Sequence, residues 1–169
     1  GQSIEKYEKC AQQIESAFPQ ILEKINEIAI ICPMEEKHIP FIADLEKECF
    51  AEPWSEDSLK DELTNETARF YVIENQGEVQ GYIGANNICG EVYITNVAVS
   101  PDARGKGYGK ALFLELTRIA RQRKCGRMEW VCLNWNQPSI DFYRSMGATS
   151  LDEWTTYRLT SEGLEGIEA

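Results

Sequence analysis

A loop with three glycines, Gly105, Gly107 and Gly109, lies between an apolar stretch that ends at Val99 and a segment of helical periodicity that begins near Lys110. Glycine permits left-handed backbone and lets the main chain come close to a ligand. Where such a loop begins a helix, its amide groups and the helix dipole together favour an anion. The pattern therefore predicts a phosphate or pyrophosphate site.

Two common phosphate-binding loops do not match this stretch. A Walker loop ends in Gly-Lys-Ser/Thr, whereas Gly109-Lys110 is followed by Ala111. A dinucleotide-binding loop belongs to the first strand–helix unit of its fold, and this loop lies past the midpoint of the chain. A plain glycine turn stays open as the alternative.

Length, composition and charge limit the class of protein. A chain of 169 residues is about one domain long, and 43% hydrophobic residues are enough for a folded core. The net charge of −11 disfavours nucleic acid and anionic membrane surfaces as partners and suits cationic small molecules or basic peptides. The apolar stretch at 28–32 is far shorter than a membrane-spanning helix, and no signal pattern opens the chain.

The cysteines and the single histidine, His38, predict no metal site. The six cysteines are irregularly spaced and none forms a C-x-x-C pair, so the usual zinc ligand sets are missing. Several lie in apolar surroundings, where free cysteine behaves as a small core residue. Reduced thiols predict a cytoplasmic location.

The loop must be positioned by a mixed α/β domain. We expect a helical extension over 1–28 and one domain over 29–169, in which strands and helices alternate around a single sheet. The expected strands are 29–32, 70–74, 78–88, 91–99, 127–133 and 154–159. The expected helices are 39–50, 55–63, the segment after the glycine loop and 139–146, with Leu112, Leu116, Ile119 and Ala120 as the buried stripe of the third.

Two motifs resemble signatures of the GNAT superfamily of N-acetyltransferases. NVAV at 96–99 followed by RGKGYG at 104–109 resembles its acetyl-CoA signature, Arg/Gln-x-x-Gly-x-Gly/Ala. NWNQPSIDFYRSMGA at 134–148 resembles its second signature, in the correct order and at a suitable distance. The resemblance covers roughly 30–160 and implies a GNAT fold: a central mixed, mostly antiparallel sheet that splays beside the cofactor, with helices on both sides.

The two halves of the chain resemble different branches of this family. FAEPWS at 50–55, Leu63 and the segment 91–99 are similar to the ribosomal-protein-alanine acetyltransferases of the RimI type. The segment from Met128 through Tyr143 to WTTYR at 154–158 is more similar to diamine and polyamine acetyltransferases. Natural divergence and a constructed hybrid both explain this mixture, and 1–28 matches neither branch.

The resemblance implies which residues bind acetyl-CoA. Main-chain groups of Val97, Ala98 and Val99 would hold the pantetheine arm. Loop amides would hold the pyrophosphate, from Arg104, Gly105, Lys106, Gly107, Tyr108 and Gly109. Asn136 stands where an asparagine contacts cofactor in RimI-type enzymes, although an asparagine at this position can also cap a helix.

The resemblance also implies an acid but leaves the base unassigned. Tyr143 matches the tyrosine that protonates the leaving thiolate, and a core aromatic is the alternative role for it. The glutamates that act as base in the two branches fall at Val131 and Thr95 in this chain. Glu129 is the preferred nearby replacement.

Other candidates for the base, and for a different route, are weaker. Glu91 and Tyr93 on the strand that leads to the loop are further candidates for the base, acting through a water chain. An acyl-cysteine route through Cys125 or Cys132 is disfavoured because the family uses direct attack. Trp54 is expected either to line the acceptor cleft or to pack in the core.

The predicted function is transfer of an acetyl group from acetyl-CoA to a primary amine, with a protein N-terminal α-amine on a basic peptide as the preferred acceptor. A polyamine, a diamine or another small cationic amine is the alternative acceptor. A non-catalytic CoA-binding module is the alternative of another class. The oligomeric state is left open, with a homodimer among the states considered.

Overall fold

The computed structural model describes residues 29–166. The expected helical extension over 1–28 lies outside the described residues, so the boundary at residue 28 stays a prediction. Within 29–166, no helix is both long and apolar enough to cross a membrane.

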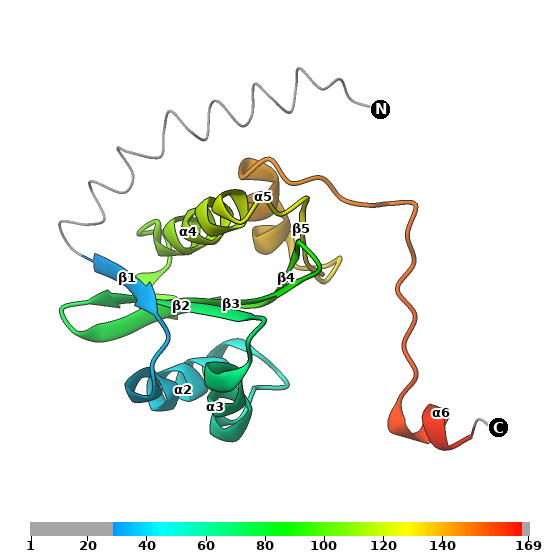
Figure 1. Cartoon of the computed structure of the whole chain (residues 1–169), viewed down its shortest axis with the longest axis horizontal. Helices are drawn as coiled ribbons and strands as arrows, with labels where there is room; N and C mark the ends of the chain where they lie inside the picture. Colours follow the sequence, from blue (N-terminus) through cyan, green and yellow to red (C-terminus); the bar gives the residue numbers. More distant parts are fainter. Residues whose placement is uncertain (1–28, 167–169) are drawn as a thin grey trace.

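One five-stranded sheet forms the centre of the domain, in the order β1-β2-β3-β4-β5 (Figure 1). Its first four strands pair antiparallel, and the fifth pairs parallel with β4. The sheet is therefore mixed and mostly antiparallel, as the sequence predicts. The strands are β1 (Ala29–Pro33), β2 (Ala68–Asn75), β3 (Glu78–Ile88), β4 (Glu91–Val99) and β5 (Met128–Glu129).

Helices cover both faces of the sheet (Figure 1). One face carries α2 (Ile39–Cys49) and α3 (Glu56–Thr64), and the other carries α4 (Tyr108–Gln122) and α5 (Gln137–Ser145). Short 3-10 turns precede α2 and α4 at Glu36–His38 and Pro101–Ala103, and a short helix α6 (Ser161–Glu165) ends the described chain. Ser55 caps α3 by accepting a hydrogen bond from the Ser58 amide at 3.1 Å.

Each face of the sheet has its own hydrophobic core. The α4 core contains Leu112, Leu116 and Ala120 of the predicted stripe, and the fourth stripe residue, Ile119, is buried as well. The second core lies under α2 and α3 and includes Ile42, Leu59 and Tyr82, among others. Burial of this apolar surface is the main force that holds the helices on the sheet.

A β-bulge in β4 changes which side chains face each core. The register with β3 pairs Ala85 with Ile94 but Gly84 with Asn96, so Thr95 is the extra residue. Ile94 packs in the α4 core, whereas Asn96 contacts Glu46 of α2. Because of the bulge, the side chains of β4 that face the α4 core are at even-numbered positions before Thr95 and at odd-numbered positions after it, at Val97 and Val99.

Two predicted strands differ from the structure. The strand expected over 127–133 is only Met128–Glu129, because its pairing with β4 ends after two residues. The segment expected as a final strand over 154–159 is irregular, with Trp154 and Tyr157 exposed by 75% and 90%. Alternation of residue types indicates a strand only where a partner edge is available, and here the segment leads away from the sheet (Figure 1).

Candidate active site

The glycine loop of the structure has the backbone that an anion site requires. Gly105 and Gly107 have φ of +77° and +87°, in the left-handed region that favours glycine. Gly107 is the N-cap of the 15-residue helix α4, and no side chain caps it. The first-turn amides of a helix have no partner within the helix. These amides and the helix dipole therefore suit a pyrophosphate.

Side-chain contacts fix this loop to the end of β4. A Cβ built on Gly109 would lie 3.6 Å from Val99 Cγ2, which shows how closely α4 begins beside the strand. Arg104 donates from Nε to the Val99 carbonyl at 3.3 Å. Tyr108 is buried, and its hydroxyl accepts a hydrogen bond from Asn75 Nδ2 at 3.1 Å. The side chains of Arg104 and Tyr108 thus anchor the loop.

The strand segment Val97–Val99 has one edge paired and the other edge outside the ladder. It pairs with β3 through Ile83↔Val97 and Gly81↔Val99, whereas the described ladder between β4 and β5 covers only Val92 and Tyr93. Main-chain groups at such an open strand edge can hydrogen-bond an extended ligand as a neighbouring strand would. A pantetheine arm, which contains amides, fits this chemistry.

Tyr143 packs against the α4 core. It is half-buried on α5 and packs on Trp130 with ring centroids 4.9 Å apart. Val97 and Val99 border this core as well. Burial, with a smaller contribution from Cys132, raises the pKa of Tyr143 to about 12. The phenol therefore stays protonated at neutral pH and can donate a hydrogen bond to a developing thiolate, although full proton transfer to a thiol of pKa about 8.5 would be uphill.

Asn136 has the capping role that the sequence left open. It is the N-cap of α5, and its Oδ1 accepts from the Ser139 amide at 3.3 Å. Pro138 stands in the first turn, as expected from its missing N–H. Capping engages the side-chain oxygen, so a contact between Asn136 and cofactor stays a prediction that would use the side-chain nitrogen.

The candidates for the base form one ion-paired cluster around Arg127. The guanidinium contacts Glu91 Oε2 at 2.8 Å and Glu129 Oε2 at 3.4 Å, and the Tyr93 hydroxyl donates to Glu91 Oε2 at 2.6 Å. Both carboxylates are therefore already engaged by the same guanidinium. Arg127 was missed at the sequence level, because its pairing with both acids depends on the β4–β5 register.

Distance along the strands separates this cluster from Val97–Val99. Glu129 pairs with Tyr93, four residues before Val97, or about 13 Å at ~3.3 Å per residue. Val131 and Thr95, the positions of the family glutamates, are both exposed, and Thr95 is the bulge residue. A water chain would have to bridge the gap from Glu129.

Trp54 packs in the core below α2 and α3 rather than standing free. Its ring lies 6.0 Å from that of Phe70, and its backbone N–H donates to Glu46 Oε2 at 2.8 Å. The ring is half-buried, so one part still faces outward. Of the two cysteines of the alternative route, Cys132 has its thiol pKa raised by burial, which makes it a poor nucleophile.

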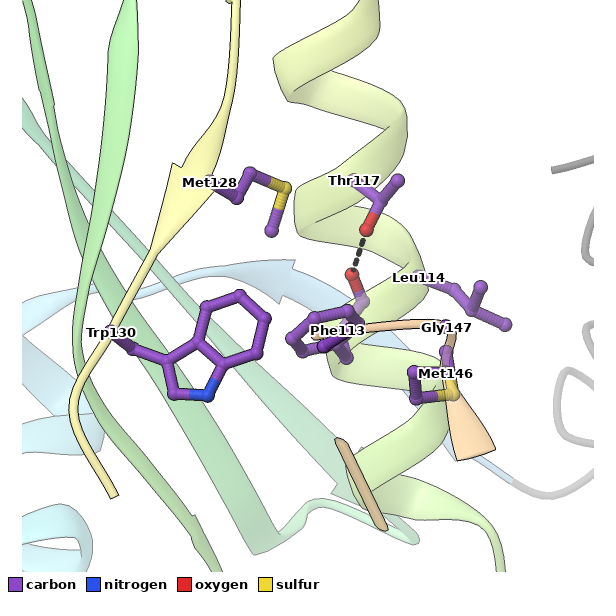
Figure 2. A pocket seen from close by; sticks show the side chains of 8 residues that line it. Phe113, Leu114, Thr117, Met128, Trp130, Met146 and Gly147 are labelled. Carbon is purple, nitrogen blue, oxygen red and sulfur yellow. Dashed lines mark hydrogen bonds between the residues drawn. The ribbon is translucent and has the colours of Figure 1, made fainter. Parts of the chain in front are cut away.

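An apolar pocket of about 260 Å³ lies between α4, β5 and the end of α5 (Figure 2). Phe113, Thr117 and Trp130 line it, with Phe113 and Trp130 in edge-to-face contact at 5.3 Å. Thr117 is ten residues from Gly107, about 15 Å along the helix axis. The pocket is therefore separate from the anion loop, and it touches the Tyr143 site through Trp130.

A Cys32–His38–Glu74 cluster has ligand atoms within 4.8 Å of one another. His38 is buried; its Nδ1 accepts from the Glu35 amide at 2.9 Å, and its Nε2 lies 3.1 Å from Glu74 Oε1. A neutral imidazole that accepts at Nδ1 carries its proton on Nε2, which then donates to Glu74. With both nitrogens so engaged, this cluster is a hydrogen-bonded support for the start of α2.

The fold and the site together define an acetyltransferase of the GNAT class. Residues 39–148 match the sequence profile of the Acetyltransferase (GNAT) family. This match covers well over half of the chain, which belongs to that family.

Individual relatives come from both branches that the sequence resembles. A putative ribosomal protein bS18-alanine N-acetyltransferase of Bacillus subtilis is 29% identical over 120 residues, which is 70% of this chain and 80% of that protein. An L-ornithine N5-acetyltransferase of Arabidopsis thaliana is 37% identical over 76 residues, 45% of this chain and 33% of that enzyme. The ribosomal-protein-S18-alanine N-acetyltransferase of Escherichia coli has a similar fold, with a TM-score of 0.66 and 23% identity over 71% of this chain and 77% of that one.

Proposed function

We propose that this acetyltransferase uses acetyl-CoA to acetylate the N-terminal α-amine of a basic peptide or protein. The observation that carries the proposal is the start of α4, which opens on glycine and has no side-chain cap, beside the Val99 side chain of the open-edged segment Val97–Val99. This arrangement offers an anion site and a strand-like site side by side. Acetyl-CoA has the matching parts, a pyrophosphate and an amide-containing arm.

The residues that would hold acetyl-CoA are those of the loop and the strand edge. Amides from Arg104 to Gly109 would receive the pyrophosphate, and main-chain groups of Val97–Val99 would receive the arm. Amides near Val97–Val99 are also the proposed donors to the carbonyl oxygen as it gains negative charge. Bound acetyl-CoA supplies the activated acetyl thioester.

The chain's own groups would manage the protons of the transfer. The amine nitrogen attacks the thioester carbonyl carbon, a C–N bond forms and the C–S bond breaks; the amine loses one proton and the sulfur ends as a thiol. Tyr143 is the proposed donor toward the sulfur. Glu129, through water, is the proposed acceptor for the amine proton, and its Oε2 lies 3.4 Å from Arg127 Nε.

An α-amine is the proposed acceptor because the segments 50–55 and 91–99 resemble RimI-type enzymes and the Bacillus subtilis relative aligns over most of its length. The net charge of −11 suits a basic peptide. A polyamine or diamine is the second candidate, favoured by the ornithine acetyltransferase as a relative. Five free cysteines among the described residues support a reducing, cytoplasmic location.

The test is release of CoA from acetyl-CoA in the presence of a panel of amines: a peptide with N-terminal alanine, spermidine, ornithine and a lysine peptide blocked at its N-terminus. We expect the highest kcat/KM with the free α-amine. Binding of CoA without turnover of any amine would identify a CoA-binding module and refute the proposal.

A further inference from the structure

A buried carboxylate that the proposed chemistry does not use, Glu46, connects the two sides of the proposed site. Its side chain is completely buried on α2, at a position of the apolar stripe. Burying a charge is costly unless hydrogen bonds satisfy it. The contacts of Glu46 therefore show what the fold uses this charge for.

The two carboxylate oxygens have different partners. Oε1 accepts from the Tyr82 hydroxyl on β3 and from Asn96 Nδ2 on β4 at 3.2 Å. Oε2 accepts from the Trp54 amide, in the loop between α2 and α3, at 2.8 Å. Burial and the hydrogen bond to Glu46 raise the pKa of Tyr82, so this hydroxyl remains a donor.

Two of these partners, Asn96 and Trp54, belong to the two halves of the proposed site. Asn96 directly precedes Val97–Val99 and follows the bulge at Thr95. Trp54 is the residue expected either to line the acceptor cleft or to pack in the core, and it is only half-buried in the structure. We propose that Glu46 is a positioning residue, which fixes the acceptor-side loop at Trp54 relative to the strand that holds acetyl-CoA. This inference rests on the proposed function.

A comparison of two variants separates reach from charge. Glu46→Asp keeps the charge but shortens the side chain by one methylene, so the carboxylate can no longer span the sheet donors and the loop. Glu46→Gln keeps the length. Its oxygen can accept from the Trp54 amide, and its NH2 group can donate to Asn96 Oδ1, a buried atom without a hydrogen-bond partner, once the Asn96 side-chain amide turns over.

We expect Glu46→Asp to lower kcat/KM for the acceptor about tenfold, since small misplacements of substrate are costly. The Kd for acetyl-CoA should stay within about twofold, and Glu46→Gln should recover most of the loss. Tyr82→Phe is the matched control: it removes a donor to the same carboxylate, leaves the Trp54 bond and should change kcat/KM by less than about twofold.

Three results would overturn the proposal: unchanged kcat/KM in Glu46→Asp, an equal loss in Tyr82→Phe, or a larger loss in Glu46→Gln than in Glu46→Asp. The last would mean that the charge itself takes part in proton transfer.

Hydrogen exchange of the Trp54 amide in the wild-type protein tests the anchoring without any turnover, and also if Glu46→Asp does not fold. We expect clear protection from exchange, and an unprotected amide would contradict the anchoring. If the wild-type protein acetylates no amine, the proposed function fails, while this exchange result still decides whether Glu46 holds the loop.

Discussion

Replacing Tyr143 by phenylalanine tests its proposed role with little disturbance of the fold. The variant loses one oxygen and keeps the ring, which packs on Trp130, Phe142 and Phe113 at centroid distances of 4.9, 5.2 and 6.1 Å. We therefore expect the free energy of unfolding to change by less than about 1 kcal/mol. Loss of the hydrogen bond that Tyr143 would donate to the developing thiolate should lower kcat about 10²-fold, equivalent to about 2.7 kcal/mol in the barrier.

The assay measures initial rates of CoA release at saturating acetyl-CoA, with the Kd for CoA and the thermal midpoint measured on the same preparations. Tyr157→Phe is the control, because it removes the hydroxyl of a tyrosine that is 90% exposed and should leave the rate unchanged. A wild-type rate in Tyr143→Phe would refute the assignment of Tyr143. A comparable fall in the affinity for CoA would show that the residue binds cofactor rather than donating to the sulfur.

Three further predictions concern the loop, the core and alkaline pH. Gly107→Ala, at a φ of +87°, should weaken acetyl-CoA binding at least fivefold, as measured by calorimetry. The control is Gly90→Ala, at a φ of +80° in a turn with open space around it, which should add similar backbone strain and leave acetyl-CoA binding unchanged. Gly84→Ala would place a Cβ 2.3 Å from Phe70 Cε1 and should lower the free energy of unfolding by about 1–3 kcal/mol in urea titrations. Burial raises the pKa of Tyr143 from 10.0 to about 12, so between these pH values the folded state keeps a proton that the unfolded state loses. The free energy of unfolding should therefore fall as pH rises from 10 to 12, and it should fall less steeply in Tyr143→Phe.

Local patterns predicted the elements that carry the cofactor site. The expected strand over 91–99 is β4 residue for residue, and the stripe of Leu112 and Leu116 is the buried face of α4. The expected strand over 78–88 is likewise β3 residue for residue, and it follows a tight turn in which Gln76 and Gly77 have φ of 54° and 84°. Each of these features depends on neighbours in the sequence, which is why the sequence is sufficient.

Features that depend on contacts between residues far apart in the sequence could not be predicted from local patterns. The bulge at Thr95 follows from the register of β4 with β3, and it decides that Asn96 meets Glu46. The Arg127 cluster likewise depends on the parallel pairing of β5. Glu46 gave one signal, a carboxylate on the apolar stripe of a predicted helix, but its three donors come from elements up to 50 residues away.

A competition between two acceptors tests the central claim most directly. The protein and acetyl-CoA would be incubated with equal amounts of spermidine and a basic peptide that begins with alanine, and mass spectrometry would locate the acetyl group. We predict acetylation of the peptide's α-amine. Acetylation of spermidine with the peptide unmodified would contradict the proposed acceptor, and no acetylation of either would contradict the proposed activity.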